Sequence, residues 1–235
     1  MSAKFDSQNP VLSFKRLLAE LVQGYEFDVE GLYMRGGAVR PLPREAAVIG
    51  KVLEVSIHEY LARRLLQVAE LNSIPASSDR VYPDITFQGS MIFPHRFALD
   101  VKCARRAAGG LVTTSAITIG TFDAEYFRNP AVKAANIMMP YGSYTAHLAL
   151  IALYDYVHGT ARDTELLVVE KWRIATRKRA SGTRCYIAAV KAIDLLRQER
   201  GDFASDEDFN VFWRSQPIGE GKEEKWRLKR DGGLQ

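Results

Sequence analysis

Residues 82–102, with the sequence YPDITFQGSMIFPHRFALDVK, decide both the fold and the chemistry expected of this chain. Residues 82–87 and 96–102 have the alternating or apolar patterns typical of strands, and the glycine-containing segment between them predicts a turn. Such a turn folds the second strand back on the first. We therefore expect Asp84, from the first strand, to lie beside Asp100, from the second.

The expected pair of carboxylates has a chemical consequence. Two carboxylates held close together repel one another unless a cation lies between them. Mg²⁺ suits this arrangement because it prefers hard oxygen ligands and fills its remaining positions with water and phosphate oxygens. The main-chain carbonyl of Val101 is one more candidate ligand. We therefore predict a magnesium site formed by Asp84, Asp100 and Val101.

Lys102 completes the pattern. Side chains repeat every two residues along a strand, so Lys102 points to the same face as Asp100. An ammonium group beside a metal stabilises negative charge on a phosphate and favours a nearby hydroxide, and this combination predicts phosphodiester hydrolysis. The alternative is an ordinary Pro-Asp turn followed by a surface Asp-Lys pair, because patterns this short also arise by chance.

A helix expected over residues 44–69 contributes one more candidate, Glu54. The helix follows from apolar residues at helical spacing between Val48 and Val68. Glu54 lies off this apolar stripe, 30 residues before Asp84. If the helix packs on the strand pair, Glu54 reaches the metal region. The alternative is a solvated glutamate on the helix surface.

Composition and length are those of a globular protein. The chain has 235 residues, of which 47% are hydrophobic and 26% charged, and these values exclude disordered, collagen-like and coiled-coil chains. No apolar run reaches the roughly 18 residues that a membrane span needs, and the polar N-terminus does not resemble a secretion signal. Cys103 and Cys185 are too few for a disulfide framework or a cysteine-based zinc site. We therefore expect a cytoplasmic protein with no membrane partner.

The positive charges gather in two stretches without acids. The net charge of +4 favours an anionic partner only mildly. The first stretch, residues 101–122, contains Lys102, Arg105 and Arg106. The second contains Lys171, Arg173, Arg177, Lys178, Arg179 and Arg184. These stretches are either solvated basic faces or parts of a phosphate-binding cleft.

The rest of the sequence predicts one α/β or α+β domain over residues 1–217, followed by a polar tail over 218–235. Periodicity and turn residues predict a helix over 11–23, a hairpin over 27–33 and 38–42, a loop over 72–78, a strand over 116–119, a helix over 130–157, a strand over 165–174, a turn over 180–183 and a short helix from the capping Ser205 to Trp213. Residues 187–196 fit a strand or a helix equally well.

Other catalytic patterns do not occur in the sequence. The four histidines lack the spacing of metal ligands. There is no glycine-rich strand-to-helix fingerprint, so no nucleotide cofactor is expected. There is also no Gly-x-Ser-x-Gly motif for a serine nucleophile.

The motifs resemble those of the EcoRV-type Type II restriction endonucleases, which are part of the PD-(D/E)xK nuclease superfamily. Residues 82–86 and 98–102 are similar to the catalytic strands of that family. Further similarities follow in the same order along residues 13–216, at 27–31 with 39–42, 117–129, 139–147, 170–172 and 208–214. Chance does not easily produce such a collinear series.

The resemblance implies a restriction-endonuclease-like core, with a central mixed sheet flanked by helices and a small dimerisation element. It implies a homodimer that uses Mg²⁺ to cut both strands of a short palindromic site in double-stranded DNA, leaving 5′-phosphates and blunt ends. Asp84 and Asp100 resemble the metal-binding carboxylates, Lys102 resembles the catalytic lysine, and Glu54 falls at the helix glutamate. The enzyme would act in the cytoplasm of a prokaryote.

The same resemblance divides the domain. It places a dimerisation hairpin at about residues 25–43, a catalytic core at about 44–135 and a DNA-recognition loop at about 176–186. A helix near 143–156 is similar to a second dimerisation element.

Two loops resemble segments that touch DNA. The first consists of Ser78, Asp79 and Arg80, where an acid and an arginine replace the amides of the family. The second is the recognition loop, which consists of Ala180, Ser181, Gly182, Thr183 and Arg184. Arg184 either makes a bidentate contact with guanine or binds a phosphate. Arg105 and Arg106, just after the catalytic lysine, are expected to contact phosphate.

Two other functions remain as alternatives. A repair or resolving nuclease with the same core would cut branched or mismatched DNA and ignore its sequence. A non-catalytic DNA-binding protein on a nuclease scaffold would bind without cutting. The presence of Asp84, Asp100 and Lys102 argues against the second alternative.

Overall fold

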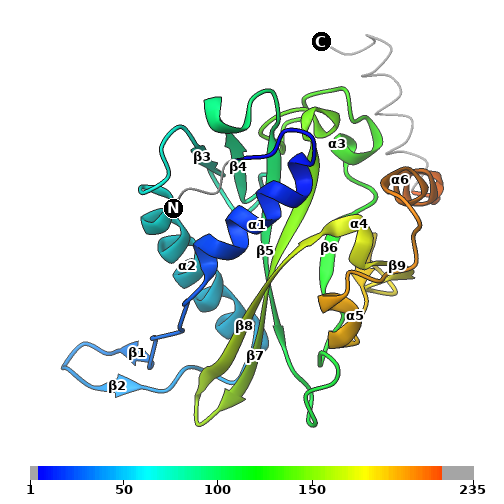
Figure 1. Cartoon of the computed structure of the whole chain (residues 1–235). Helices are drawn as coiled ribbons and strands as arrows, with labels where there is room; N and C mark the ends of the chain where they lie inside the picture. The colour runs from blue at the N-terminus through cyan, green and yellow to red at the C-terminus, as the bar shows by residue number, and fades with distance from the viewer. Residues whose placement is uncertain (1–4, 219–235) are drawn as a thin grey trace.

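The computed structural model describes residues 5–218 and has a mixed α/β fold built on a five-stranded sheet (Figure 1). The strand order is β3-β4-β5-β7-β8, in which β5 and β7 are parallel and the other neighbours antiparallel. The bounds are β3 Asn72–Pro75, β4 Ile85–Gln88, β5 Phe97–Arg105, β7 Ala146–Val157 and β8 Thr160–Glu170. The expected central mixed sheet flanked by helices is confirmed.

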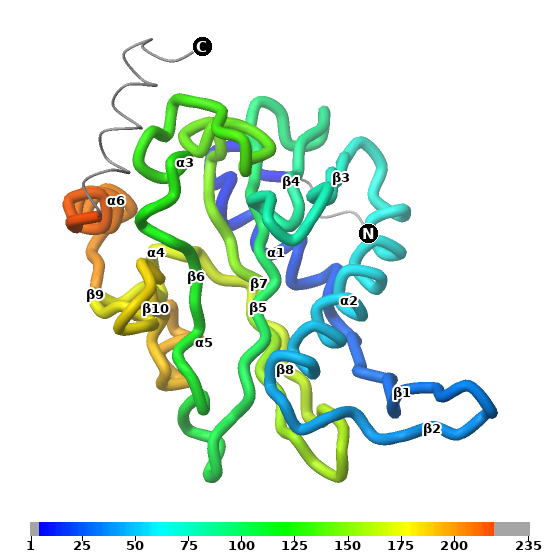
Figure 2. The backbone as a smooth tube through the Cα atoms, turned by 180° about the vertical axis from the view of Figure 1, so that it is seen from behind, coloured from blue at the N-terminus to red at the C-terminus, as the bar shows by residue number. Residues whose placement is uncertain are grey.

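Two smaller sheets accompany the central one. The order β6-β10-β9 joins β6 (Thr118–Thr121), β10 (Tyr186–Ala189) and β9 (Ala175–Arg179). The pair β1 (Leu32–Tyr33) and β2 (Val39–Arg40) forms a hairpin that projects from the body of the molecule (Figures 1 and 2). The hairpin expected between 27 and 42 therefore forms, with much shorter strands.

Six α-helices and two 3₁₀ turns complete the described residues. Their bounds are α1 Pro10–Val22, α2 Ala46–Leu65, α3 Glu125–Arg128, α4 Lys171–Ile174, α5 Ile193–Arg197 and α6 Asp206–Ser215, with 3₁₀ turns at Ser90–Ile92 and Tyr141–Ser143. The two long helices predicted from periodicity, α1 and α2, are confirmed. Ser205 caps α6 as expected, because its Oγ accepts a hydrogen bond from the N–H of Asp208 at 3.1 Å.

The central sheet separates two hydrophobic cores. Even-numbered residues of β7, from Leu148 to Tyr154, pack with α1 and α2, whereas Ala149, Ile151 and Leu153 pack with α6 and the three-stranded sheet. Figures 1 and 2 show α1 and α2 on one side of β5 and β7, and β6, β9 and α5 on the other. The alternation follows from the period of two along a strand.

The helix predicted over residues 130–157 is wrong, and β7 occupies its second half. Both faces of β7 are buried, so its sequence is apolar at nearly every position and lacks the alternation that identifies a half-buried strand. A continuous apolar run of this kind is compatible with either a helix or a buried strand. The second dimerisation element expected at 143–156 is consequently a central strand, not a helix.

Two further expectations are corrected in detail. The loop expected over 72–78 contains β3, an edge strand that pairs with β4. Its residues are all exposed or half-buried, because an edge strand is only partly covered. Residues 187–196, which fitted a strand or a helix, contain the end of β10 and then α5.

Two remaining expectations concern the polar tail and the lack of a membrane span. Most of the polar tail, from residue 219, lies outside the described residues. Within residues 5–218, no helix combines the length and the hydropathy that crossing a bilayer requires.

Candidate active site

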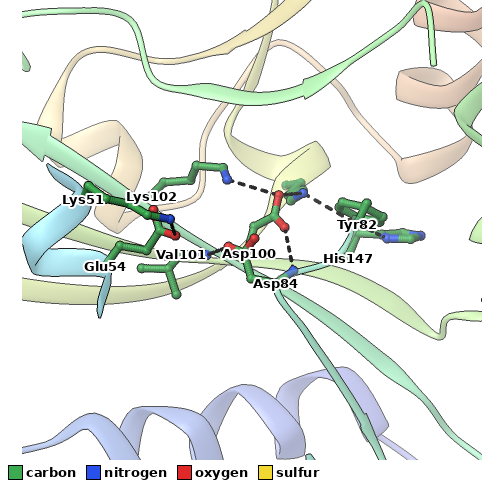
Figure 3. Close-up of polar contacts among 9 residues, drawn as sticks. Lys51, Glu54, Tyr82, Asp84, Asp100, Val101, Lys102 and His147 are labelled. Carbon is green, nitrogen blue, oxygen red and sulfur yellow. Dashed lines mark hydrogen bonds and ion pairs between the residues drawn. The ribbon is translucent and has the colours of Figure 1, made fainter. Parts of the chain in front are cut away.

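The antiparallel pairing of β4 and β5 brings the two candidate carboxylates together. The last ladder pair is Ile85 with Leu99, and one step further along the same register Asp84 stands opposite Asp100. The N–H of Asp84 donates to Oδ1 of Asp100 at 3.3 Å. Figure 3 shows the two side chains side by side where the paired strands end. The expectation that Asp84 lies beside Asp100 is met.

Asp100 lies between two ammonium groups. Its Oδ2 is 3.3 Å from Nζ of Lys102 and 2.5 Å from Nζ of Lys171. The Asp100 side chain is only 8% exposed, so these contacts occur with little competing water. Burial favours the neutral carboxyl, but the two ammonium groups outweigh it and hold the pKa of Asp100 below its ordinary value. Asp100 is therefore ionised at neutral pH.

Asp84 has the opposite electrostatic environment. Burial, followed by the negative charge of Asp100, raises the pKa of Asp84. Its Oδ2 accepts a hydrogen bond from the N–H of Val101 at 2.7 Å, which orients the carboxylate. A divalent cation placed here would relieve the repulsion between the two carboxylates.

Lys102 is more open to solvent than the other lysine of this cluster. Its side chain is 28% exposed, compared with 6% for Lys171. Burial opposes its charge, but the carboxylates of Asp100 and Asp84 outweigh burial and raise the pKa of Lys102. Lys102 therefore remains an ammonium at neutral pH, on the accessible side of Asp100.

Lys171 was not expected at this site. We grouped it by sequence with the basic residues up to Arg184, but it begins α4 directly after β8 and is buried against Asp100. Its Nζ lies 4.4 Å from the centroid of the Tyr82 ring. The signal in the sequence was a lysine placed two residues after the apolar run Leu166–Val169.

Glu54 contacts a different partner. Its carboxylate forms an ion pair with the Lys51 ammonium at 2.9 Å, and the same ammonium lies 3.0 Å from the carboxylate of Asp79. Figure 3 shows Glu54 beside Val101 and Lys102, on the α2 side of the site. The charge of Glu54 also contributes to the raised pKa of Lys102. Glu54 thus lies at the edge of the cluster and bonds no member of it.

The donor set suits a hard divalent cation. No group of three or more His, Cys, Asp or Glu side chains with metal-binding geometry occurs in residues 5–218. Two carboxylates and one main-chain carbonyl remain. In the continued register Val101 stands opposite Pro83, which has no N–H to donate, so strand pairing cannot satisfy the Val101 carbonyl. Mg²⁺ accepts such a sparse protein set because water and phosphate oxygens fill its other positions.

The two loops expected to contact DNA are both exposed. Ser78, Asp79 and Arg80 precede β4 at the surface. The second loop joins β9 to β10, and in it Ser181 Oγ accepts hydrogen bonds from the N–H groups of Thr183 and Arg184, both at 3.3 Å. The members of this loop from Gly182 to Arg184 are exposed, whereas Ala180 and Ser181 are half-buried.

The two arginines after Lys102 differ in their contacts. Arg105 stacks on the ring of Tyr156, with 5.2 Å between its Cζ and the ring centroid. Arg106 is largely buried, and its guanidinium donates to the carbonyl of Asp163 at 2.8 Å and to Glu165 at 3.1 Å. These contacts give Arg106 a structural function between β5 and β8.

One comparison with known proteins identifies a family. The model of a family described as restriction endonuclease EcoRV matches residues 23–230. Among solved structures, the NlaIV restriction endonuclease is similar with a TM-score of 0.50 and 14% identity, over 98% of this chain and 87% of that one. At this identity the similarity concerns the fold. A comparison with curated proteins finds no match.

Proposed function

Because the chain belongs to the EcoRV restriction endonuclease family, we propose that it is a homodimeric, Mg²⁺-dependent enzyme that cuts both strands of a short palindromic DNA site. The observation that carries this proposal is the convergence of Asp84, Asp100 and Lys102 at the end of the β4–β5 pair. An ammonium beside two carboxylates is a set of groups suited to phosphodiester hydrolysis with a divalent cation.

Each of these residues receives a function. Asp84 and Asp100, with the carbonyl of Val101, would hold Mg²⁺. When bound, Mg²⁺ neutralises charge on the phosphate and makes water a better nucleophile. Lys102 orients the attacking water and stabilises the negative charge that develops on the phosphate. The water oxygen bonds to phosphorus in line with the P–O3′ bond, which breaks. The 3′ oxygen leaves with a proton, and the phosphate stays on the 5′ end.

The projecting hairpin supports the proposed dimer. Its apolar side chains are unusually open to solvent: Tyr33 is 75% exposed and Val39 is 59% exposed. An isolated two-stranded hairpin is barely stable in water, so a partner that covers it would stabilise it. A second copy of the chain is the simplest partner, because a two-fold axis then matches a palindromic site and relates the two cuts. Blunt ends follow only from the family.

The exposed loops are the proposed DNA contacts. Residues 78–80 and 180–184 would approach the duplex, with Arg184 able to read guanine or to bind a phosphate. We retain Arg105 as a phosphate contact. Arg106 is a weaker candidate because its guanidinium already binds Asp163 and Glu165. The enzyme would act in the cytoplasm of a prokaryotic cell, as the family does.

The proposal is tested by incubating supercoiled plasmids of known sequence with the purified protein and Mg²⁺. Discrete fragments with 5′-phosphates are expected, and EDTA should abolish them. Lys102→Ala should bind DNA in Ca²⁺ but not cut in Mg²⁺, whereas Lys133→Ala, which removes an exposed lysine elsewhere, should cut normally.

Each alternative function has its own outcome in the same experiment. Cleavage confined to branched or mismatched DNA would replace restriction by a repair or resolving activity. Folded wild-type protein that binds plasmid in Ca²⁺ but never cuts in Mg²⁺ would replace it by a binding function.

A further inference from the structure

Lys171 is a buried lysine whose ammonium makes three contacts, one with Asp100 and two with Tyr82. It is 5% exposed and donates to Oδ2 of Asp100 at 2.5 Å and to the hydroxyl of Tyr82 at 3.4 Å. The same ammonium lies over the Tyr82 ring, at 4.4 Å from the centroid. A buried charge is costly unless it is paired and hydrogen-bonded, and here it is both.

A chain of hydrogen bonds from Tyr141 through His147 and Tyr82 orients the group that contacts Lys171. The Nε2 of His147 lies 3.2 Å from the carbonyl of Tyr141, which only accepts, so Nε2 carries the proton. Burial lowers the pKa of His147 to about 3, so the ring is neutral and Nδ1 is an acceptor. The Tyr82 hydroxyl, at 2.6 Å, donates to Nδ1 and is left free to accept from Lys171. The directions of these hydrogen bonds are therefore mutually consistent from the carbonyl of Tyr141 to the ammonium of Lys171.

The contacts of Asp100 give its two oxygens different functions. Oδ2 is shared by Lys171 and Lys102, whereas the one hydrogen bond that Oδ1 accepts from residues 5–218 comes from the N–H of Asp84, at 3.3 Å. Oδ1 is thus the oxygen on the side of the second carboxylate. Burial lowers the pKa of Lys171 from its ordinary value, while the adjacent carboxylate of Asp100 stabilises its charge. With both aspartates and both lysines ionised, their charges sum to zero, so the cluster then attracts a cation less strongly than two carboxylates alone.

We propose that Lys171 is a positioning residue that fixes Oδ2 of Asp100, directs Oδ1 toward Asp84 and offsets one negative charge, so that the DNA-free site binds divalent cations weakly. This inference rests on the proposed function for its effect on cutting, but its effect on metal binding can be measured without DNA. When DNA binds, its phosphate adds a negative charge to the site. This charge compensates for the carboxylate charge that Lys171 offsets, so the DNA-bound site attracts a divalent cation more strongly. Lys102, on the solvent side, remains the group that meets the phosphate.

The test compares full-length wild type with Lys171→Met and Lys171→Gln. Binding of Mn²⁺ to DNA-free protein is measured by electron paramagnetic resonance, and cleavage is measured at saturating Mg²⁺. Both variants remove the charge, so both should bind Mn²⁺ roughly tenfold or more tightly than wild type. Lys171→Met should cut roughly tenfold or more slowly, because Asp100 loses its fixed orientation. Lys171→Gln, whose amide still donates to Oδ2, should recover part of the rate.

Lys15→Met is the matched control, since Lys15 is also a shielded lysine in an ion pair, with Glu199. It should lower stability without changing Mn²⁺ affinity. A folded Lys171 variant with wild-type Mn²⁺ affinity, or equal tightening in Lys15→Met, would overturn the proposal. Unchanged cleavage in both Lys171 variants would also overturn it. If the wild type does not cut, the proposed function fails, while the comparison of Mn²⁺ affinities still decides the function of Lys171. Should Lys171→Met not fold, Lys171→Gln gives the same comparison.

Discussion

The main-chain N–H of Val101 donates a hydrogen bond to Oδ2 of Asp84 at 2.7 Å, two residues beyond the last ladder pair of β4 and β5. In a regular antiparallel ladder this N–H would meet a main-chain carbonyl of the opposite strand. A carboxylate takes that place here. The backbone of β5 thereby orients a side chain from the segment that leads into β4, and the strand pairing itself sets the geometry of the site.

Replacing Asp84 by Asn should separate catalysis from stability. Asparagine keeps an oxygen for the Val101 N–H but loses the charge that Mg²⁺ needs, so cleavage should fall by roughly a hundredfold or more. The folded-state pKa of Asp84 is raised, so ionised Asp84 destabilises the metal-free fold above that pKa. In EDTA at pH 7, Asp84→Asn should therefore melt at a higher temperature than wild type. The difference should shrink as the pH falls toward about 4, the ordinary pKa of an aspartate.

Thermal unfolding followed by circular dichroism over this pH range checks the effect. Asp79→Asn is the control, because it makes the same chemical change at an exposed aspartate that is paired with Lys51. A lower melting temperature for Asp84→Asn at every pH would contradict the electrostatic argument.

The buried strand β7 should be far more sensitive to truncation in its middle than at its end. Ile151 is 0% exposed and packs in the core on the α6 side, so Ile151→Ala should cost about 2–5 kcal/mol through lost burial and a cavity. Val157 ends the same strand at 40% exposure, and Val157→Ala should cost less than about 1 kcal/mol. Urea unfolding at one fixed protein concentration measures both. A similar loss of unfolding free energy at the two positions would show that β7 does not lie between two hydrophobic cores.

The carboxylate pair was predictable because it depends on local rules. A turn between two strands and the period of two along β5 suffice to place Asp84, Asp100 and Lys102 together. These rules use residues within one short segment. The helical periodicity of α2 likewise follows from local sequence, because one face of the helix is buried and the other is solvated.

The missed features depend on contacts between distant segments. Lys171 lies 71 residues from Asp100 in the sequence, and nothing near it shows that the chain returns to the site there. The misread strand β7 has a core on each face, a property that belongs to the packed sheet and not to the strand's own pattern. Burial from two sides removes the very alternation by which a strand is recognised.

The hairpin should control assembly. Tyr33→Asp combined with Val39→Lys places charges on its exposed apolar surface and should convert the proposed dimer to a monomer. The fold should survive, because both side chains are open to solvent in the single chain. Leu66→Lys, at a position 88% exposed elsewhere on the surface, is the control and should remain dimeric. Sedimentation equilibrium gives the masses. A double variant with the mass of the wild type would show that the hairpin is not the interface.

Arg105 and Arg106 are adjacent in sequence but should behave differently. Arg106 binds Glu165 and the carbonyl of Asp163, so Arg106→Ala should chiefly destabilise the fold. Arg105 contacts the Tyr156 ring and forms no ion pair within the described residues, so its charge is available to a phosphate. Arg105→Ala should weaken binding to cognate and unrelated DNA alike and should reduce the slope of log affinity against log salt by about one. Binding is measured in Ca²⁺, where cutting does not interfere. If Arg106→Ala changes the salt slope and Arg105→Ala does not, the assignment of the two arginines is reversed, and the contact of Arg106 with Glu165 must open when DNA binds.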